Sequence, residues 1–112
     1  MDKALGILKQ YYGYSSFREG QEEIIREILN GNDVLTIMPT GGGKSICYQV
    51  PAILLDGITI VISPLISLMK DQVDNINNLG IKSAYINSSL SNIEINNILD
   101  EAAKNEIKIL YV

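Results

Sequence analysis

The residues with the clearest chemical potential lie in one octapeptide, Met38-Pro39-Thr40-Gly41-Gly42-Gly43-Lys44-Ser45. The apolar run before it predicts a buried strand, and the apolar stretch after Lys44 predicts a helix. A glycine-rich loop between a strand and a helix is a P-loop, in which backbone N–H groups surround phosphate oxygens. Lys44 would contact the β- and γ-phosphates there, and Ser45 would ligate Mg²⁺. The octapeptide therefore predicts a nucleoside triphosphate site.

One position of this octapeptide departs from the strict pattern G-x-x-x-x-G-K-[ST], because Met38 stands where the first glycine belongs. The alternative interpretation is a glycine-rich turn with an exposed lysine. The flanking strand and helix patterns favour the phosphate site. We expect Met38 to pack beneath the loop instead of contacting a nucleotide.

Composition narrows the classes of protein. The chain has 112 residues, 46% of them apolar, and a net charge of −4 from 9 basic and 13 acidic residues. This balance argues against a broad basic surface that wraps nucleic acid, so any such contact should be local. A single cysteine, Cys47, excludes an internal disulfide, and the lack of histidine argues against a zinc site. No apolar run reaches membrane-spanning length and no signal peptide is recognisable, so we expect a soluble, cytoplasmic protein without a membrane partner.

The hydrophobic pattern alternates between strands and helices. Two helices are predicted first, at residues 2–12 and 20–30, and strands follow at 33–38, 57–62, 83–86 and 107–112. The intervening helices run from Lys44 past Pro51, from a Ser63 N-cap with Pro64 in the first turn, and from a Ser91 capping box to about Lys104. This order predicts an α/β fold with a parallel sheet of about four strands and helices on both faces.

A second candidate segment, residues 12–21, lies upstream of the octapeptide. The amide of Gln21 has the donor and acceptor that would read the edge of adenine. Tyr14 and Arg18 supply a ring and a guanidinium that would stack on a purine. The alternative is a loop in which Tyr14 and Phe17 pack in the core while Arg18 is solvated. The spacing alone leaves both open.

A third segment, residues 63–73, begins at the carboxyl end of a predicted strand, where ligands bind in open α/β sheets. A helix N-terminus with Ser63 and Ser67 would bind a phosphate of a nucleic-acid strand. The alternative is an ordinary capped helix whose apolar residues pack in the core. Both interpretations remain open on this pattern.

Together the three segments resemble the RecQ family of superfamily 2 DNA helicases. Residues 12–21 are similar to its motif 0, residues 38–52 to motif I and residues 63–73 to motif Ia, so the resemblance spans nearly the whole chain. The family tolerates a residue other than glycine at position 38. Two mild departures are Tyr12, where phenylalanine is common, and Glu19, where proline is common.

The resemblance implies a fold and a set of site residues. Residues 1–112 would be the N-terminal part of the first RecA-like ATP-binding domain, a partial P-loop fold that contains motifs 0, I and Ia. Tyr14 and Arg18 would flank adenine and Gln21 would bond its edge. The phosphates would be held by Thr40, Gly41, Gly42, Gly43 and Lys44, with Mg²⁺ on Ser45. Single-stranded DNA would be faced by Ser63, Pro64, Ser67 and Lys70.

The resemblance also implies an activity. The intact protein would be an ATP-dependent 3′–5′ DNA helicase of the bacterial cytoplasm that uses ATP and Mg²⁺ on single-stranded and partly duplex DNA, in recombination and repair. The family's Asp-Glu-x-His motif and second RecA-like domain fall outside these residues. We therefore expect the chain alone to bind nucleotide at most, without hydrolysing ATP or unwinding DNA. Two alternatives are a P-loop kinase and a catalytically inactive nucleotide-binding or partner-docking module.

Overall fold

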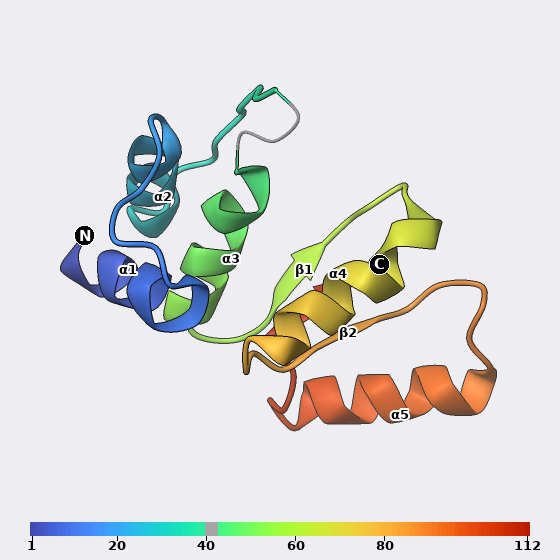
Figure 1. Cartoon of the computed structure of the whole chain (residues 1–112). Coiled ribbons are helices and arrows are strands. Elements are labelled where there is room, and N and C mark those ends of the chain that lie inside the picture. Colours follow the sequence, from blue (N-terminus) through green and yellow to red (C-terminus); the bar gives the residue numbers. More distant parts are fainter. Residues whose placement is uncertain (40–42) are drawn as a thin grey trace. The chain divides into compact units, whose positions relative to one another are not determined.

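The structure is a computed structural model that describes residues 1–39 and 43–112. These residues form two compact units, Met1–Asp56 and Gly57–Val112 (Figure 1). The first unit is helical, and the second combines helices with a parallel sheet, which confirms the predicted α/β class. Within the described ranges, no helix has the length and apolar character needed to cross a membrane.

The first unit is built around helix α3, which begins at the end of the glycine-rich loop. Its elements are α1 (Asp2–Ile7), the π-helix η1 (Leu8–Tyr12), α2 (Gln21–Leu29) and α3 (Lys44–Leu54) (Figure 1). Both α1 and α2 pack against α3, around a core of Ala4, Ile25 and Val50. Gly13 ends η1 with a φ of +74°, a conformation that glycine adopts without steric cost. The two predicted N-terminal helices are therefore confirmed, and Pro51 lies inside α3 as expected.

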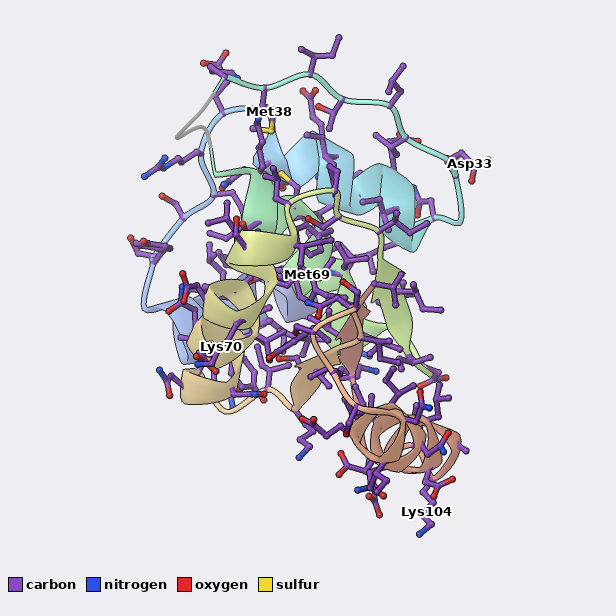
Figure 2. All side chains as sticks on the ribbon, turned by 90° about the vertical axis from the view of Figure 1, so that its right-hand side faces the viewer. Asp33, Met38, Met69, Lys70 and Lys104 are labelled. Carbon is purple, nitrogen blue, oxygen red and sulfur yellow. The ribbon has the colours of Figure 1, made fainter. Side chains whose placement is uncertain are left out.

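The predicted strand at residues 33–38 is wrong. The segment 33–39 forms neither helix nor strand, and Leu35 and Ile37 are 93% and 94% exposed. Figure 2 labels Asp33 and Met38 along this segment. A strand forms only where its N–H and C=O groups meet those of a neighbour, and the described sheet is built from other residues. The apolar pattern therefore predicted a buried strand, but a strand also needs a neighbour to pair with, and the pattern carries no information about one.

The second unit contains a three-stranded parallel sheet where about four strands were predicted. Its elements are β1 (Thr59–Val61), α4 (Ile66–Asn78), β2 (Ser83–Tyr85), α5 (Asn92–Ala103) and β3 (Ile109–Tyr111). The strand order is β1-β3-β2, and Leu110 on the central strand faces Ile60 on one side and Ala84 on the other. The three strands lie within the predicted ranges 57–62, 83–86 and 107–112, and each is shorter than its range.

The burial of the β3 side chains agrees with its central position in the sheet. Ile109, Leu110 and Tyr111 are all buried, as expected for a strand with a neighbour on both sides in a parallel sheet. Helix α4 packs against β2, and its buried residues Met69 and Val73 are four residues apart on one helical face. Figure 2 labels Met69 on this helix. The helical spacing of these apolar residues in the sequence therefore places them on one buried face of α4.

The predicted capping box at the start of α5 is confirmed. The Glu94 backbone N–H donates to Ser91 Oγ at 3.2 Å, and the Ser91 backbone N–H donates to Glu94 Oε1 at 3.1 Å. These two bonds satisfy donors that a helix N-terminus otherwise leaves unpaired. The helix ends at Ala103 with Lys104 as its C-cap, which agrees with the predicted end.

We expect Ser91→Ala to lower the free energy of unfolding by about 1 kcal/mol, because the substitution removes the N-cap acceptor. Urea denaturation followed by far-ultraviolet circular dichroism would measure the change. The matched control is Ser88→Ala, an exposed serine that precedes α5 in the same connection. An equal loss in both variants would contradict a role for the cap.

Candidate nucleotide site and nucleic-acid interface

The first unit contains a cavity of about 610 Å³ between the predicted adenine-reading segment and the start of α3. It is lined by Tyr12, Tyr14, Ser16, Arg18, Gln21, Gly43, Lys44, Ser45 and Ile46. Six of these residues were predicted from the sequence, three in each segment. The structure therefore brings the predicted base-binding and phosphate-binding residues to one cavity. The predicted phosphate ligands Thr40, Gly41 and Gly42 lie outside the described residues.

Gln21 joins the two sides of this cavity. Its side chain is only 2% exposed. The Arg18 backbone N–H donates to Gln21 Oε1 at 2.8 Å, and Gln21 Nε2 donates to the Gly43 carbonyl at 3.1 Å. A primary amide has two donor hydrogens and two acceptor lone pairs, so one of each remains after these bonds. The amide thus holds the loop against the start of α3 and keeps capacity for a ligand.

Gly43 is required both by the backbone and by the space around it. It is the N-cap of α3, with φ of +81° and ψ of +34° in the left-handed region. A Cβ at this position would overlap Gln21 Nε2. Only glycine therefore permits both this conformation and the contact with Gln21. The result is a helix N-terminus whose first N–H groups and dipole favour an anion, with Lys44 as the first helical residue.

The donor set at Ser45 fits a magnesium ion bound through phosphate and water. Ser45 is exposed and lines the cavity next to Lys44. Mg²⁺ takes oxygen ligands and keeps several waters, so a single hydroxyl is a sufficient protein contribution when phosphates supply the rest. In the part of the chain that the structure describes, no cluster of three or more histidine, cysteine, aspartate or glutamate residues forms an all-protein metal site.

Burial agrees with the structural alternative for residues 12–21 at Phe17 and at the exposed Arg18, and disagrees with it at Tyr14. Phe17 packs against the hydrophobic core of the first unit, as the structural alternative predicted. Tyr14 does not, because it is 53% exposed and lines the cavity together with Arg18. Sequence reasoning missed three lining residues, Tyr12, Ser16 and Ile46. All three lie within or beside the two segments, so proximity was the only signal that pointed to them.

Cys47 is a small, buried side chain of α3. It is 5% exposed, and its Sγ lies 3.9 Å from Met38 Sδ and 3.7 Å from the Gly43 carbonyl oxygen. Burial raises the pKa of the Cys47 thiol, so the side chain stays protonated and weakly nucleophilic near neutral pH. Met38 is partly buried beside it.

The predicted cap of α4 is wrong, because the helix begins at Ile66 with Leu65 as its N-cap. The Ser63 backbone N–H donates to the Val112 carbonyl at 3.0 Å, which keeps Ser63 in an extension of the sheet. Its hydroxyl accepts from the Leu65 N–H at 3.3 Å, a short turn that competes with a helix cap. Pro64 therefore precedes the helix.

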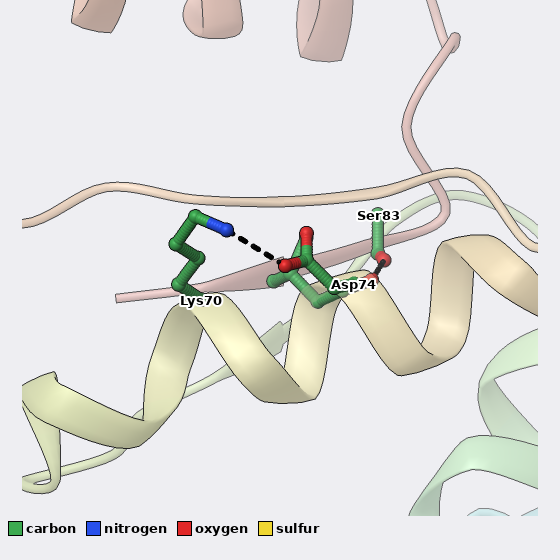
Figure 3. Close-up of polar contacts among 4 residues, drawn as sticks. Lys70, Asp74 and Ser83 are labelled. Carbon is green, nitrogen blue, oxygen red and sulfur yellow. Dashed lines mark hydrogen bonds and ion pairs between the residues drawn. The ribbon is translucent and has the colours of Figure 1, made fainter.

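The predicted nucleic-acid segment presents polar groups at the start of α4. Pro64, Ser67 and Lys70 are exposed, and Ser63 is half-buried. Ser67 and Lys70 are three residues apart and share one helical face. Lys70 Nζ lies 2.9 Å from Asp74 Oδ2, and Figure 3 shows this pair one turn apart on the helix. The hydrogen bond to Asp74 raises the pKa of Lys70, so the ammonium stays charged.

The chain is similar to known proteins over nearly its whole length. The family model described as DEAD/DEAH box helicase matches residues 18–112. The ATP-dependent DNA helicase RecQ of Haemophilus influenzae is 51% identical over 109 residues, which are 97% of this chain and 18% of that protein. RecQ of Bacillus subtilis is 51% identical over 113 residues, which are 100% of this chain and 19% of that protein. The probable ATP-dependent DNA helicase RecS of Bacillus subtilis is 43% identical over 113 residues, 100% of this chain and 22% of that protein.

The chain therefore belongs to the DEAD/DEAH box helicase family. Within that family, the resemblance to RecQ helicases that the three segments indicated is confirmed by 51% identity over nearly the whole chain. The chain spans 18% and 19% of the length of the two RecQ relatives above.

We expect Gly43→Ala to destabilise the chain more than Gly31→Ala. Both glycines have a positive φ, +81° and +86°, so both substitutions strain the backbone by a similar amount. At Gly31 a Cβ would meet no atom within 4 Å, whereas at Gly43 it would displace the Gln21 amide. The extra loss at Gly43 should be about 1–3 kcal/mol in the free energy of unfolding, since buried polar groups lose their partners. Equal losses in urea denaturation would show that the contact with Gln21 is unimportant.

Proposed function

We propose that this chain is the ATP-binding part of an ATP-dependent DNA helicase that moves 3′–5′ in DNA recombination and repair. The observation that carries the proposal is the single cavity lined by Arg18 and Gln21 on one side and by Lys44 and Ser45 on the other. Its volume of about 610 Å³ is in the range of small-molecule sites. The relatives are themselves named ATP-dependent DNA helicases, which supports the same activity here.

At the base end of the cavity, the proposed ligand is adenine. Tyr14 and Arg18 flank it with a ring and a guanidinium. Gln21 bonds the purine edge with the donor and the acceptor left over from its two protein bonds. Because those two bonds already fix the Gln21 amide, its orientation costs little entropy when the base binds.

At the phosphate end, we propose that Thr40, Gly41, Gly42 and Gly43 supply backbone N–H groups to the phosphates. Lys44 adds a positive charge at the N-terminus of α3, where the helix dipole already favours an anion. Ser45 would hold Mg²⁺ through its hydroxyl. Held there, the ion would supply positive charge that offsets the negative charge of the phosphates.

We propose that the start of α4 contacts one strand of single-stranded or partly duplex DNA through Ser63, Pro64, Ser67 and Lys70. The contact is local, because the chain has a net charge of −4 and no broad basic surface is available from its composition. Ser67 and Lys70 on one face of the helix supply a hydroxyl and an ammonium for backbone phosphates.

Hydrolysis needs a positioned water and charge stabilisation of the transition state in addition to nucleotide binding. We propose that the residues of this chain only bind nucleotide, and that the chain alone neither hydrolyses ATP nor unwinds DNA. Other helicase domains would supply the groups that hydrolysis needs. We place this activity in the cytoplasm, where the DNA substrate lies.

The test is a calorimetric titration of the chain with Mg-ATP and, in parallel, with Mg-GTP. We expect selective binding of ATP, because the Gln21 amide and the Tyr14–Arg18 pair suit adenine. We expect Lys44→Ala to weaken Mg-ATP binding by about 1.5–3 kcal/mol, since it removes a charge-assisted contact to phosphate.

Lys9→Ala is the matched control, because it removes an exposed lysine of the first unit that does not line the cavity. Unchanged affinity of Lys44→Ala would exclude the loop as the phosphate site. Equal affinity for ATP and GTP would keep the phosphate site and refute the adenine reading.

We expect Asp74→Asn to strengthen binding to a single-stranded oligonucleotide by roughly two- to five-fold. In the native chain a phosphate must compete with Asp74 for Lys70, and the substitution removes this competition. Fluorescence anisotropy over a range of salt concentrations would measure it. The dependence of log affinity on log salt should steepen by up to about 0.7, the contribution of one additional phosphate contact to a single strand.

Asp71→Asn is the matched control for charge alone. It removes the same charge from the same helix, and the only ion pair of Lys70 within the described ranges is with Asp74. A smaller gain is therefore expected for Asp71→Asn. Equal gains in affinity in the two variants would show that the effect comes from overall charge alone. No gain in affinity for Asp74→Asn would show that Lys70 does not contact the oligonucleotide.

A further inference from the structure

Tyr12 is a residue of the cavity to which the proposed function assigns no role. It is the last residue of the π-helix η1, and Gly13 turns the chain immediately after it. Short π-helical turns occur frequently at functional sites. Here the Tyr12 side chain lines the same cavity as Tyr14 and Arg18.

The hydroxyl of Tyr12 is bonded to α3, 37 residues further along the chain. Tyr12 Oη donates to Gln49 Oε1 at 2.6 Å, a short distance for a hydrogen bond between neutral groups. Gln49 is 7% exposed, so its carbonyl oxygen has little access to water. Burial raises the pKa of the Tyr12 phenol, so it remains a protonated donor throughout the physiological pH range.

The bond reaches the helical face that also carries the proposed magnesium ligand. Ser45 and Gln49 are four residues apart on α3, and such residues lie above one another on one face. The base-side segment is therefore tied to α3 at two places. Gln21 ties its end to Gly43, and Tyr12 ties its beginning to Gln49, with Tyr14 and Arg18 between the two ties.

We propose that Tyr12 is a positioning residue for the nucleobase, which acts through its bond to Gln49 and not by contacting phosphate. The bond holds the loop that carries Tyr14 and Arg18 against α3 before the ligand arrives. Without the bond, the loop would have to be ordered when the base binds, and that cost would appear as lost affinity. This inference rests on the proposed function, because it assumes that the cavity takes a nucleotide.

The experiment compares the native chain with Tyr12→Phe by calorimetry, using Mg-ATP and Mg-tripolyphosphate as the two ligands. Tyr12→Phe keeps the ring and removes only the donor. We expect it to weaken Mg-ATP binding roughly three- to ten-fold, the value of one lost hydrogen bond, and to leave Mg-tripolyphosphate binding unchanged. If Tyr12 had only a structural role, Tyr12→Phe would weaken the binding of both ligands.

Two further variants sharpen the comparison. Tyr11→Phe removes the same atom from the neighbouring residue of η1, which does not line the cavity, and it should change neither affinity. Gln49→Leu removes the acceptor and should reproduce Tyr12→Phe, and the two substitutions together should weaken Mg-ATP binding no more than either alone. Gln49→Leu also tests the bond independently if Tyr12→Phe does not fold.

The outcomes separate this inference from the proposed function. Native affinity for Mg-ATP in Tyr12→Phe, equal weakening of both ligands, or additive losses with Gln49→Leu would each overturn the positioning role while leaving the nucleotide site in place. If the native chain binds neither ligand, the proposed function fails and this inference fails with it.

Discussion

The first unit depends on one buried amide. Gln21 accepts a hydrogen bond from the Arg18 backbone and donates one to the Gly43 carbonyl, so it closes the loop at residues 12–21 onto the start of α3. The constraint is mutual, because the amide fits only where Gly43 has no Cβ. A buried polar group without such partners would cost about 1–3 kcal/mol. Satisfying this side chain brings together the two segments that line the cavity.

Charge in this chain is placed locally and not spread over a surface. The net charge is −4, yet Arg18 and Lys44 line the same cavity, and α3 adds the positive end of its dipole there. In the second unit, Lys70 is exposed but shared with Asp74. This local placement of charge agrees with the proposed contacts to individual phosphates and not with indiscriminate binding of polyanions.

Local sequence signals predicted the elements whose stability is local. The Ser91–Glu94 capping box and the apolar stripe of α4 were both anticipated. Strands need distant partners, and the strands predicted at 57–62, 83–86 and 107–112 formed whereas the one at 33–38 did not. Residues 33–38 have the composition of a strand, but a strand requires hydrogen-bonding neighbours that no local pattern can supply. The start of α4 was also misplaced, because the pairing of Ser63 with Val112 overrode its tendency to cap.

By itself, the sequence determined which chemical groups are present and which lie near one another along the chain. From residue type and spacing it predicted phosphate and Mg²⁺ contacts at Lys44 and Ser45, and it gave Gln21 and Arg18 as candidates for purine recognition, because such recognition demands particular donors. Only the tertiary structure decided that these groups share one cavity, that the Gln21 amide is already bonded on both sides, and that Tyr12 reaches Gln49 across 37 positions. The physical reason is that spacing sets helical phase and caps, whereas contacts between distant segments depend on how their side chains pack.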